Sequence, residues 1–196
     1  MLRGLSIHRD VNWHYSFWRP LNWHRFDMRD QYGFIYSPEQ DPRTGFYLSV
    51  QDLSDVLDEA VTEADLPALR DGVIEGLESL PDCEILEEKE IAKGYAIGFE
   101  VLMTFTLDGE TCKRRMRLLY NDRQQYTIYG QGRPPSEYDV FHDTFEFIYS
   151  TFEFADILAL MGMPVNESSR IKWEGGGQGV ETAPKAPREH KINIPD

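Results

Sequence analysis

The alternation of apolar and polar residues is clearest over Ile97–Tyr120, where it predicts a β-hairpin. Asp108-Gly109 is a two-residue turn of the type I′ kind, since both positions must tolerate a positive φ. If the strands pair directly on either side of this turn, Glu100 lies opposite Arg117 on a polar face. The other face is then apolar and contains Ile97, Phe99, Val101, Phe105, Cys112, Met116, Leu118 and Tyr120. The pattern therefore predicts one half of a half-buried antiparallel sheet.

Shorter segments with the same alternation predict further strands, and spacings of three and four residues predict two helices. The strands are expected at Val11–Trp18, Gly33–Tyr36, Phe46–Val50, Cys83–Glu90 and Gln125–Tyr129. The first helix has the apolar stripe Leu66, Leu69, Val73, Leu77 and Leu80, and Pro81 ends it. The second begins at Pro134-Pro135-Ser136 and has the stripe Tyr138, Phe141, Phe145, Ile148 and Phe152. We expect the second helix to cover the apolar face of the hairpin, and the chain to have an α+β fold.

The composition changes at both ends of this region and suggests three parts. Residues 1–12 are expected to be an N-terminal extension, residues 13–160 the α+β domain, and residues 161–196 a C-terminal tail. Gly175-Gly176-Gly177 has linker composition, whereas Ile192-Asn193-Ile194 could add a strand to another sheet. The tail is therefore either a spacer or a docking arm, and as an arm it could hold a homo-oligomer together.

The charge of the chain is strongly negative and unevenly distributed. The formal net charge is −14, which argues against nucleic acid or an anionic membrane as a partner. Between Gln51 and Glu90 there are fourteen acidic residues and two basic ones, a net charge of −12. This window is either a solvated helical face or a surface that meets a basic partner or gathers divalent cations. No signal-peptide core or membrane-spanning run is evident, so membrane insertion is not expected and a cytoplasmic location is the default expectation.

The sequence contains no recognisable catalytic or metal-binding motif. It has no glycine-rich phosphate loop, no GxSxG elbow and no HxH or HExxH spacing. Cys83 and Cys112 are expected to be reduced, and Cys112 falls on the apolar face of the hairpin, where a thiol is inert. We therefore expect no catalytic residues, cofactor or metal, although His14, His24 and His142 leave the question of a metal open.

Two groups of residues are candidates for binding a partner or ligand. Lys113, Arg115 and Arg117 share the polar face of the hairpin, where they either neutralise Glu100 and the nearby acidic surface or form a groove for an anion. Arg114 falls on the apolar face, so we expect its side chain to reach an edge or to mark a β-bulge.

The tryptophans form the second group. Trp13 and Trp18 should lie on opposite faces of a strand, as core residues or as interface anchors, and Trp173 stands alone in the tail.

Three stretches together resemble the PsbP-like superfamily, which includes Ran-binding nuclear-import factors and several bacterial lipoproteins. They are Tyr15–Trp23, the meander Tyr95–Tyr129, and Ser150–Phe154 at the end of the second helix. The resemblance implies an α/β/α sandwich with a central antiparallel sheet and an accessory, assembly or partner-binding role without a universal active site. The chain is expected to depart from many members in two respects, since no secretion signal is evident and residues 161–196 are expected to form an added tail.

Three functions follow as hypotheses from these observations. The first is a non-enzymatic accessory, assembly or adaptor protein that binds a macromolecular partner, most simply another protein. The second is a protein that binds a small anionic ligand, or an unrecognised hydrolase, with its site near Arg115 and Arg117. The third is a bacterial immunity protein whose acidic surface neutralises a basic toxin.

Overall fold

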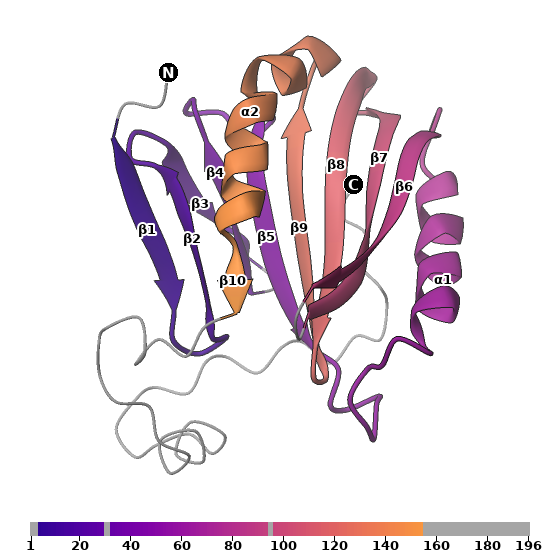
Figure 1. The fold of residues 1–196 in the computed structure, drawn as a ribbon. Coiled ribbons are helices and arrows are strands. Elements are labelled where there is room, and N and C mark those ends of the chain that lie inside the picture. Colours follow the sequence, from indigo (N-terminus) through magenta and orange to yellow (C-terminus); the bar gives the residue numbers. More distant parts are fainter. Residues whose placement is uncertain (1–3, 30–31, 94–95, 155–196) are drawn as a thin grey trace. The chain divides into compact units, whose positions relative to one another are not determined.

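The computed structural model describes residues 4–29, 32–93 and 96–154 (Figure 1). These residues fold as two compact units. Among the described residues, the first unit comprises residues 4–22 and 144–154, and the second comprises residues 23–143. The expected tail, including Trp173 and Ile192-Asn193-Ile194, lies outside the described residues.

The second unit is built on a seven-stranded sheet in which every neighbouring pair is antiparallel. Its strand order is β3-β4-β5-β9-β8-β7-β6. The strands are β3 (His24–Asp27), β4 (Gly33–Ser37), β5 (Gly45–Asp52), β6 (Glu84–Lys93), β7 (Ala96–Leu107), β8 (Glu110–Asn121) and β9 (Gln124–Gly132). The α+β class expected from the sequence is confirmed, and β3 is a strand that the sequence analysis did not predict.

The β7–β8 hairpin has the register that its turn predicted. Asp108 and Gly109 have φ values of 53° and 80°, as a type I′ turn requires. Leu107 pairs with Glu110, and the register continues without a shift to Ile97 and Tyr120. All the apolar side chains assigned to one face therefore do share it.

Helix α1 (Leu66–Glu78) covers that apolar face, which corrects our expectation that the second helix would do so. Leu66, Val73 and Leu77 are buried in one cluster with Phe99, Val101 and the rest of the hairpin's apolar face. Pro67 lies in the first turn of α1, where its missing N–H removes no helical hydrogen bond. The alternation along a hairpin shows which side chains share a face, but it does not show which helix covers them.

The first turns of α2 (Pro135–Thr151) lie on the opposite face of the same sheet. Arg115, on the polar face of the hairpin, donates a hydrogen bond from Nε to the Tyr138 hydroxyl at 3.3 Å. The backbone approaches closely here, because a Cβ on Gly132 would lie 1.9 Å from the Tyr138 nitrogen. The second unit thus has helix on both faces of a central sheet, as an α/β/α sandwich requires. Neither helix is long and apolar enough to span a bilayer, within the described part of the chain.

The first unit contains a smaller antiparallel sheet with the strand order β1-β2-β10. Its strands are β1 (Leu5–Asp10), β2 (Tyr15–Pro20) and β10 (Glu153–Phe154). The expected strand at 11–18 is wrong in its first half, where residues 11–14 form a turn. The carboxylate of Asp10 accepts hydrogen bonds from the backbone nitrogens of Asn12 and Trp13, at 2.9 and 3.0 Å. This Asx-type turn prevents residues 11–14 from continuing the strand, although their side chains alternate. β1 lies within residues 1–12, which the sequence analysis assigned to an N-terminal extension.

Candidate functional site

The polar face of the β6–β7–β8 sheet is centred on a buried carboxylate, Glu100 of β7. Glu100 is only 3% exposed. One of its oxygens accepts hydrogen bonds from Lys89 Nζ at 3.0 Å and Arg115 Nη1 at 2.8 Å, and the other accepts one from Arg117 Nε. We call Lys89, Glu100, Arg115 and Arg117 the Glu100 cluster.

Strand register brings these four side chains together. Lys89 of β6 pairs directly with Glu100, and Glu100 pairs directly with Arg117 of β8. Arg115 lies two residues from Arg117, so the period of the strand places both on the same face. Each contact thus joins residues on neighbouring strands, and the cluster ties three strands together.

The basic candidates of the sequence analysis are held in ion pairs within the chain. Besides Glu100, Arg115 Nη2 contacts Glu87 at 3.2 Å. Lys113 Nζ lies 2.7 Å from the Asp139 carboxylate and 5.1 Å from the centre of the Tyr138 ring. The side chains of Arg115 and Arg117 are only 14% and 18% exposed. The structure therefore brings Lys113, Arg115 and Arg117 to one face, but it pairs them with carboxylates of the same unit.

The surroundings of Glu100 favour its ionised form. Burial by itself would raise the pKa of this carboxyl, but the charge and hydrogen bond of Arg117, with Lys89 and Arg115, outweigh burial and lower the pKa below its ordinary value. Glu100 is thus a fixed anion whose role is to hold three cations.

Arg114 is fully buried, which corrects our expectation that it would reach an edge or mark a bulge. It is 1% exposed, and its Nε and Nη2 donate to the Gln131 side-chain oxygen at 2.9 and 2.6 Å. Its guanidinium carbon lies 4.6 Å from the ring centre of Phe105 and 4.1 Å from that of Tyr129. The register passes Arg114 without a shift, because an amide and two aromatic rings accommodate the cation inside the core.

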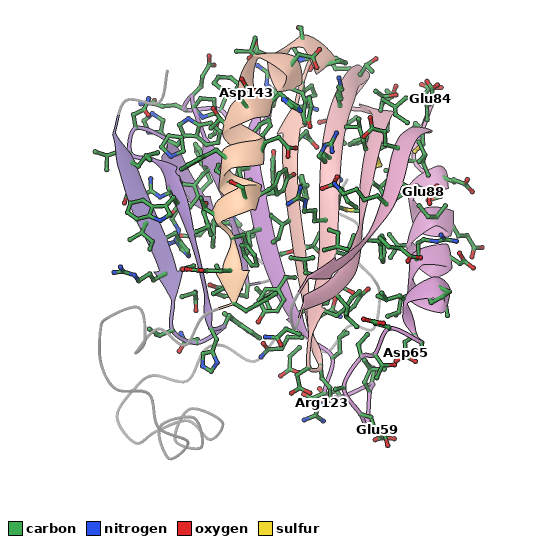
Figure 2. The ribbon with its side chains drawn as sticks, in the orientation of Figure 1. Glu59, Asp65, Glu84, Glu88, Arg123 and Asp143 are labelled. Atoms are coloured by element: carbon green, nitrogen blue, oxygen red, sulfur yellow. The ribbon has the colours of Figure 1, made fainter. Side chains whose placement is uncertain are left out.

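The carboxylates of residues 51–90, which we call the acidic window, are exposed to solvent, unlike that of Glu100. All fourteen acidic residues between 51 and 90 are exposed. Within the described part of the chain, ion pairs involve two of them, Asp71 with Arg70 at 3.1 Å and Glu87 with Arg115, which leaves twelve without one. Figure 2 shows Glu84 and Glu88 on β6 and Asp65 at the start of α1. We call the exposed carboxylates of α1 and β6 the acidic surface: Asp71, Glu75, Glu78, Glu84, Glu87, Glu88 and Glu90.

The acidic surface lies along an edge of the sheet. β6 is the last strand in the sheet order, and α1 runs beside it (Figure 1). Glu88 and Glu90 pair with Val101 and Phe99, so they lie on the face that α1 covers. A cavity of about 210 Å³ between the two elements is lined by Arg70, Glu88, Lys89, Glu90, Phe99, Glu100 and Val101. Leu86 of β6 lies where the β6–β7 register shifts, between Ile85 and Glu87, and it is 44% exposed.

A second cavity, of about 190 Å³, contains two guanidinium groups that are also paired. Arg43 Nε lies 2.6 Å from the Asp41 carboxylate, and Arg133 lies 2.9 Å from Asp108 and 3.4 Å from Glu110. Glu39 and Glu137 also line the cavity. An anionic ligand entering here would meet more carboxylates than cations.

The tryptophan candidates occupy different environments. Trp13 and Trp23 are buried, whereas Trp18 is 42% exposed on β2. Among the histidines, His142 lies 3.2 Å from the adjacent Asp143, and His14 and His24 are exposed. Over residues 4–29, 32–93 and 96–154, no three histidine, cysteine or acidic side chains are arranged to hold a metal ion. Cys112 is buried in the core, and burial raises the pKa of its thiol.

Comparison with known proteins shows a structural likeness without a sequence match. No protein-family model matches the sequence, and no curated protein matches it. The solution structure of cyanobacterial PsbP (CyanoP) from Synechocystis sp. PCC 6803 matches with a TM-score of 0.57 and 10% identity, over 76% of this chain and 92% of that one. The chain has the PsbP-like fold.

Two further solved structures are similar at lower TM-scores. The Ran-binding protein Mog1p of Saccharomyces cerevisiae has a TM-score of 0.49 and 10% identity, over 79% of this chain and 97% of that one. A protein from Bacteroides thetaiotaomicron VPI-5482 has a TM-score of 0.48 and 12% identity, over 88% of this chain and 57% of that one.

Proposed function

We propose that this protein is a non-enzymatic accessory protein that binds a basic segment of a protein partner on its acidic surface. The observation that carries the proposal is that five of the seven carboxylates of the acidic surface form no ion pair with the described cations: Glu75, Glu78, Glu84, Glu88 and Glu90. Like charges gathered on one surface repel one another, which is unfavourable for the isolated protein. A basic partner relieves this repulsion and is attracted over a distance set by ionic strength.

The position of the carboxylates at a sheet edge suggests how the partner segment binds. An extended segment can add to an exposed edge strand through main-chain hydrogen bonds, while its alternate side chains supply specificity. A segment beside β6 would place lysine or arginine side chains near Glu84, Glu88 and Glu90. Arg70 and Lys89, which line the adjacent cavity, supply the only two cations of the 51–90 window.

The groove for a small anion receives less support from the same geometry. Its proposed ligands, Lys113, Arg115 and Arg117, already contact Asp139 and Glu100. An anion would therefore have to displace a carboxylate that is part of the chain. A basic toxin remains one kind of partner that the acidic surface would fit.

The test is affinity capture from the native source with two matched variants. Glu84→Gln/Glu88→Gln/Glu90→Gln removes three charges from the acidic surface, and Glu39→Gln/Glu137→Gln/Asp143→Asn removes three charges elsewhere. We expect the first variant to lose the captured chain and the second to retain it. Raising the salt from about 50 mM to about 500 mM should weaken capture by the wild type. Equal capture by both variants, with unchanged circular dichroism, would refute the proposal.

A further inference from the structure

Strand β1 is an edge strand of the small sheet in the first unit. It stands first in the order β1-β2-β10, so one side of it has no neighbouring strand among the described residues (Figure 1). β1 pairs with β2 over its whole length, from Leu5 opposite Pro20 to Asp10 opposite Tyr15, without a shift in register. An unbroken edge strand presents a regular row of main-chain donors and acceptors to any strand that approaches it.

Two hydrogen bonds show how the main chain of β1 is oriented. The backbone nitrogen of Leu21 donates to the Gly4 oxygen at 3.2 Å, so the main chain at Gly4 bonds towards β2. Trp18, which lies opposite Ile7, instead directs its backbone N–H away from β1 and donates to Thr151 Oγ1 at 3.1 Å. Antiparallel strands alternate between pairs of residues that are hydrogen-bonded to each other and pairs that are not. Ile7 and Trp18 are therefore a pair without mutual hydrogen bonds, and the main chain of Ile7 points to the open side.

The same alternation assigns the open side of β1 to Leu5, Ile7 and Arg9. Each of these residues directs its backbone N–H and C=O away from β2. The position of Pro20 agrees with this assignment, because proline has no N–H and lies opposite Leu5, where no bond between the two strands is made. The side chains of the three residues share one face of the sheet, since the period of a strand is two.

These three residues form a row that is complementary to itself. If a second β1 lies antiparallel with the two Ile7 residues opposite each other, Leu5 of each copy faces Arg9 of the other copy. Every outward N–H and C=O of the row then meets a partner. The two Ile7 side chains also join the half-exposed Trp18 of each copy in one apolar row across the sheets. A register centred on Arg9 would instead place like charges opposite each other, which is unfavourable.

The other free edges are less suited to pairing with a copy of themselves. β6 has a register shift and carries the exposed carboxylates Glu87, Glu88 and Glu90. β3 has only four residues and β10 only two. Short, charged or bulged edge strands resist pairing with other copies of the same chain. β1 has six residues and a regular register, and the charge in its outward row, Arg9, faces an apolar residue in the self-paired arrangement.

We propose that two copies of this chain form a dimer by antiparallel pairing of their β1 strands, which joins their small sheets into one continuous sheet. The contact is isologous, with a two-fold axis between the two Ile7 residues. Pairing satisfies the outward main-chain groups of β1 and removes an open sheet edge. The proposal concerns the first unit and does not depend on the function proposed for the acidic surface.

Sedimentation velocity of the full-length protein over about 1–200 µM tests for this dimer. Ile7→Pro removes the central outward N–H without removing a bond to β2, and proline is tolerated where the N–H of an edge strand faces solvent. We expect the dissociation constant of the dimer to rise by at least about tenfold in this variant.

Asp27→Pro is the matched control on the edge strand β3. The backbone nitrogen of Met28 donates to the Gly33 oxygen, so the N–H of Asp27 points away from β4. This variant should dimerise as wild type does. Circular dichroism checks that both proline variants retain their fold.

A cross-link gives a second readout if Ile7→Pro folds poorly. The Cα atoms of a hydrogen-bonded antiparallel pair lie about 5.5 Å apart, within the range that a disulfide bridges. Ile7→Cys should therefore form a disulfide-linked dimer under mild oxidation. Arg9→Cys is the matched control on the same row, because its two copies would lie about 13 Å apart along the paired strands and should not form a disulfide.

Three results would overturn the proposal. The first is a protein that remains monomeric at every concentration. The second is a dimer whose dissociation constant is the same in Ile7→Pro as in wild type, which would place the contact elsewhere. The third is a cross-link that forms at position 9 and not at position 7, which would exclude the register centred on Ile7.

Discussion

The Glu100 cluster and the β6 carboxylates of the acidic surface lie on the same three-stranded part of the sheet, yet their charges have opposite surroundings. Glu100 is 3% exposed and contacts three cations, whereas Glu84, Glu88 and Glu90 are exposed and form no ion pair with the described cations. A buried carboxylate needs its partners, since desolvation without them is costly. An exposed carboxylate remains hydrated and available. The first set of charges therefore stabilises the sheet, and the second is free to recognise a partner.

Removing the central carboxylate should have the largest effect on stability. Glu100→Ala leaves Arg115 and Arg117 largely buried without their shared anion, and we expect a loss of about 3 kcal/mol in the free energy of unfolding. Urea unfolding followed by circular dichroism measures this loss. The matched variant Glu88→Ala should change the free energy of unfolding by less than about 0.5 kcal/mol. Similar losses in both variants would remove the distinction between the two sets.

Removing one cation should have a smaller effect, because the other two remain. Arg117→Gln removes a charge-assisted hydrogen bond to Glu100 but keeps a side chain that can donate, and we expect a loss of about 1–2 kcal/mol. The same urea titration applies. A loss as large as that of Glu100→Ala would mean that Arg115 and Lys89 contribute little.

The lowered pKa of Glu100 predicts a pH dependence with a definite sign. Its pKa in the folded state lies below the ordinary value of 4.5, so the unfolded chain binds the proton more readily. The contribution of Glu100 is therefore complete above about pH 5 and is lost as pH falls through the folded-state pKa. We expect wild type to exceed Glu100→Gln in stability at about pH 6, and the gap to narrow towards about pH 3. A gap that is constant with pH would contradict this.

The sequence predicted contacts between neighbouring strands better than contacts between layers. The Asp108-Gly109 turn and strict alternation were enough to place Glu100 opposite Arg117, because a turn of fixed type sets the register. The prediction of which helix covers Phe99 was wrong, because both helices carry an apolar stripe of suitable length. The turn at residues 11–14 was missed because the Asp10 carboxylate caps it, whereas the residues themselves alternate like a strand.

The candidate site was predicted only in part, because the sequence fixes the register of the β7–β8 hairpin but not the pairing of the hairpin with other strands. Register placed Lys113, Arg115 and Arg117 on one face, but Lys89 reached Glu100 only through the β6–β7 pairing, which no turn signal of known type fixes. Arg114 was correctly assigned to the apolar face, beside Met103. The expectation that its side chain would reach an edge or mark a bulge was wrong, because its partner, Gln131, lies on β9, 17 residues away. The acidic window was visible as a charge count. That Glu84, Glu87, Glu88 and Glu90 lie on an edge strand could be seen only from the strand order.

Neutralising the acidic surface should have the smallest effect on stability. For Glu84→Gln/Glu88→Gln/Glu90→Gln we expect a change within about 0.5 kcal/mol, or a slight gain, because repulsion among the carboxylates decreases. Thermal unfolding at low salt gives the comparison. A marked loss of stability would show that these carboxylates are structural after all.

The association rate constant with a captured basic partner, measured at two salt concentrations, tests the division of charges most directly. For wild type we predict a fall of about tenfold or more between about 50 mM and about 500 mM salt, as for electrostatically steered binding. For Glu84→Gln/Glu88→Gln/Glu90→Gln the association rate constant should be low at both salt concentrations. For Lys113→Gln it should decrease with salt as much as it does for wild type. A wild-type rate constant that does not change with salt, or one that collapses in Lys113→Gln alone, would contradict the account.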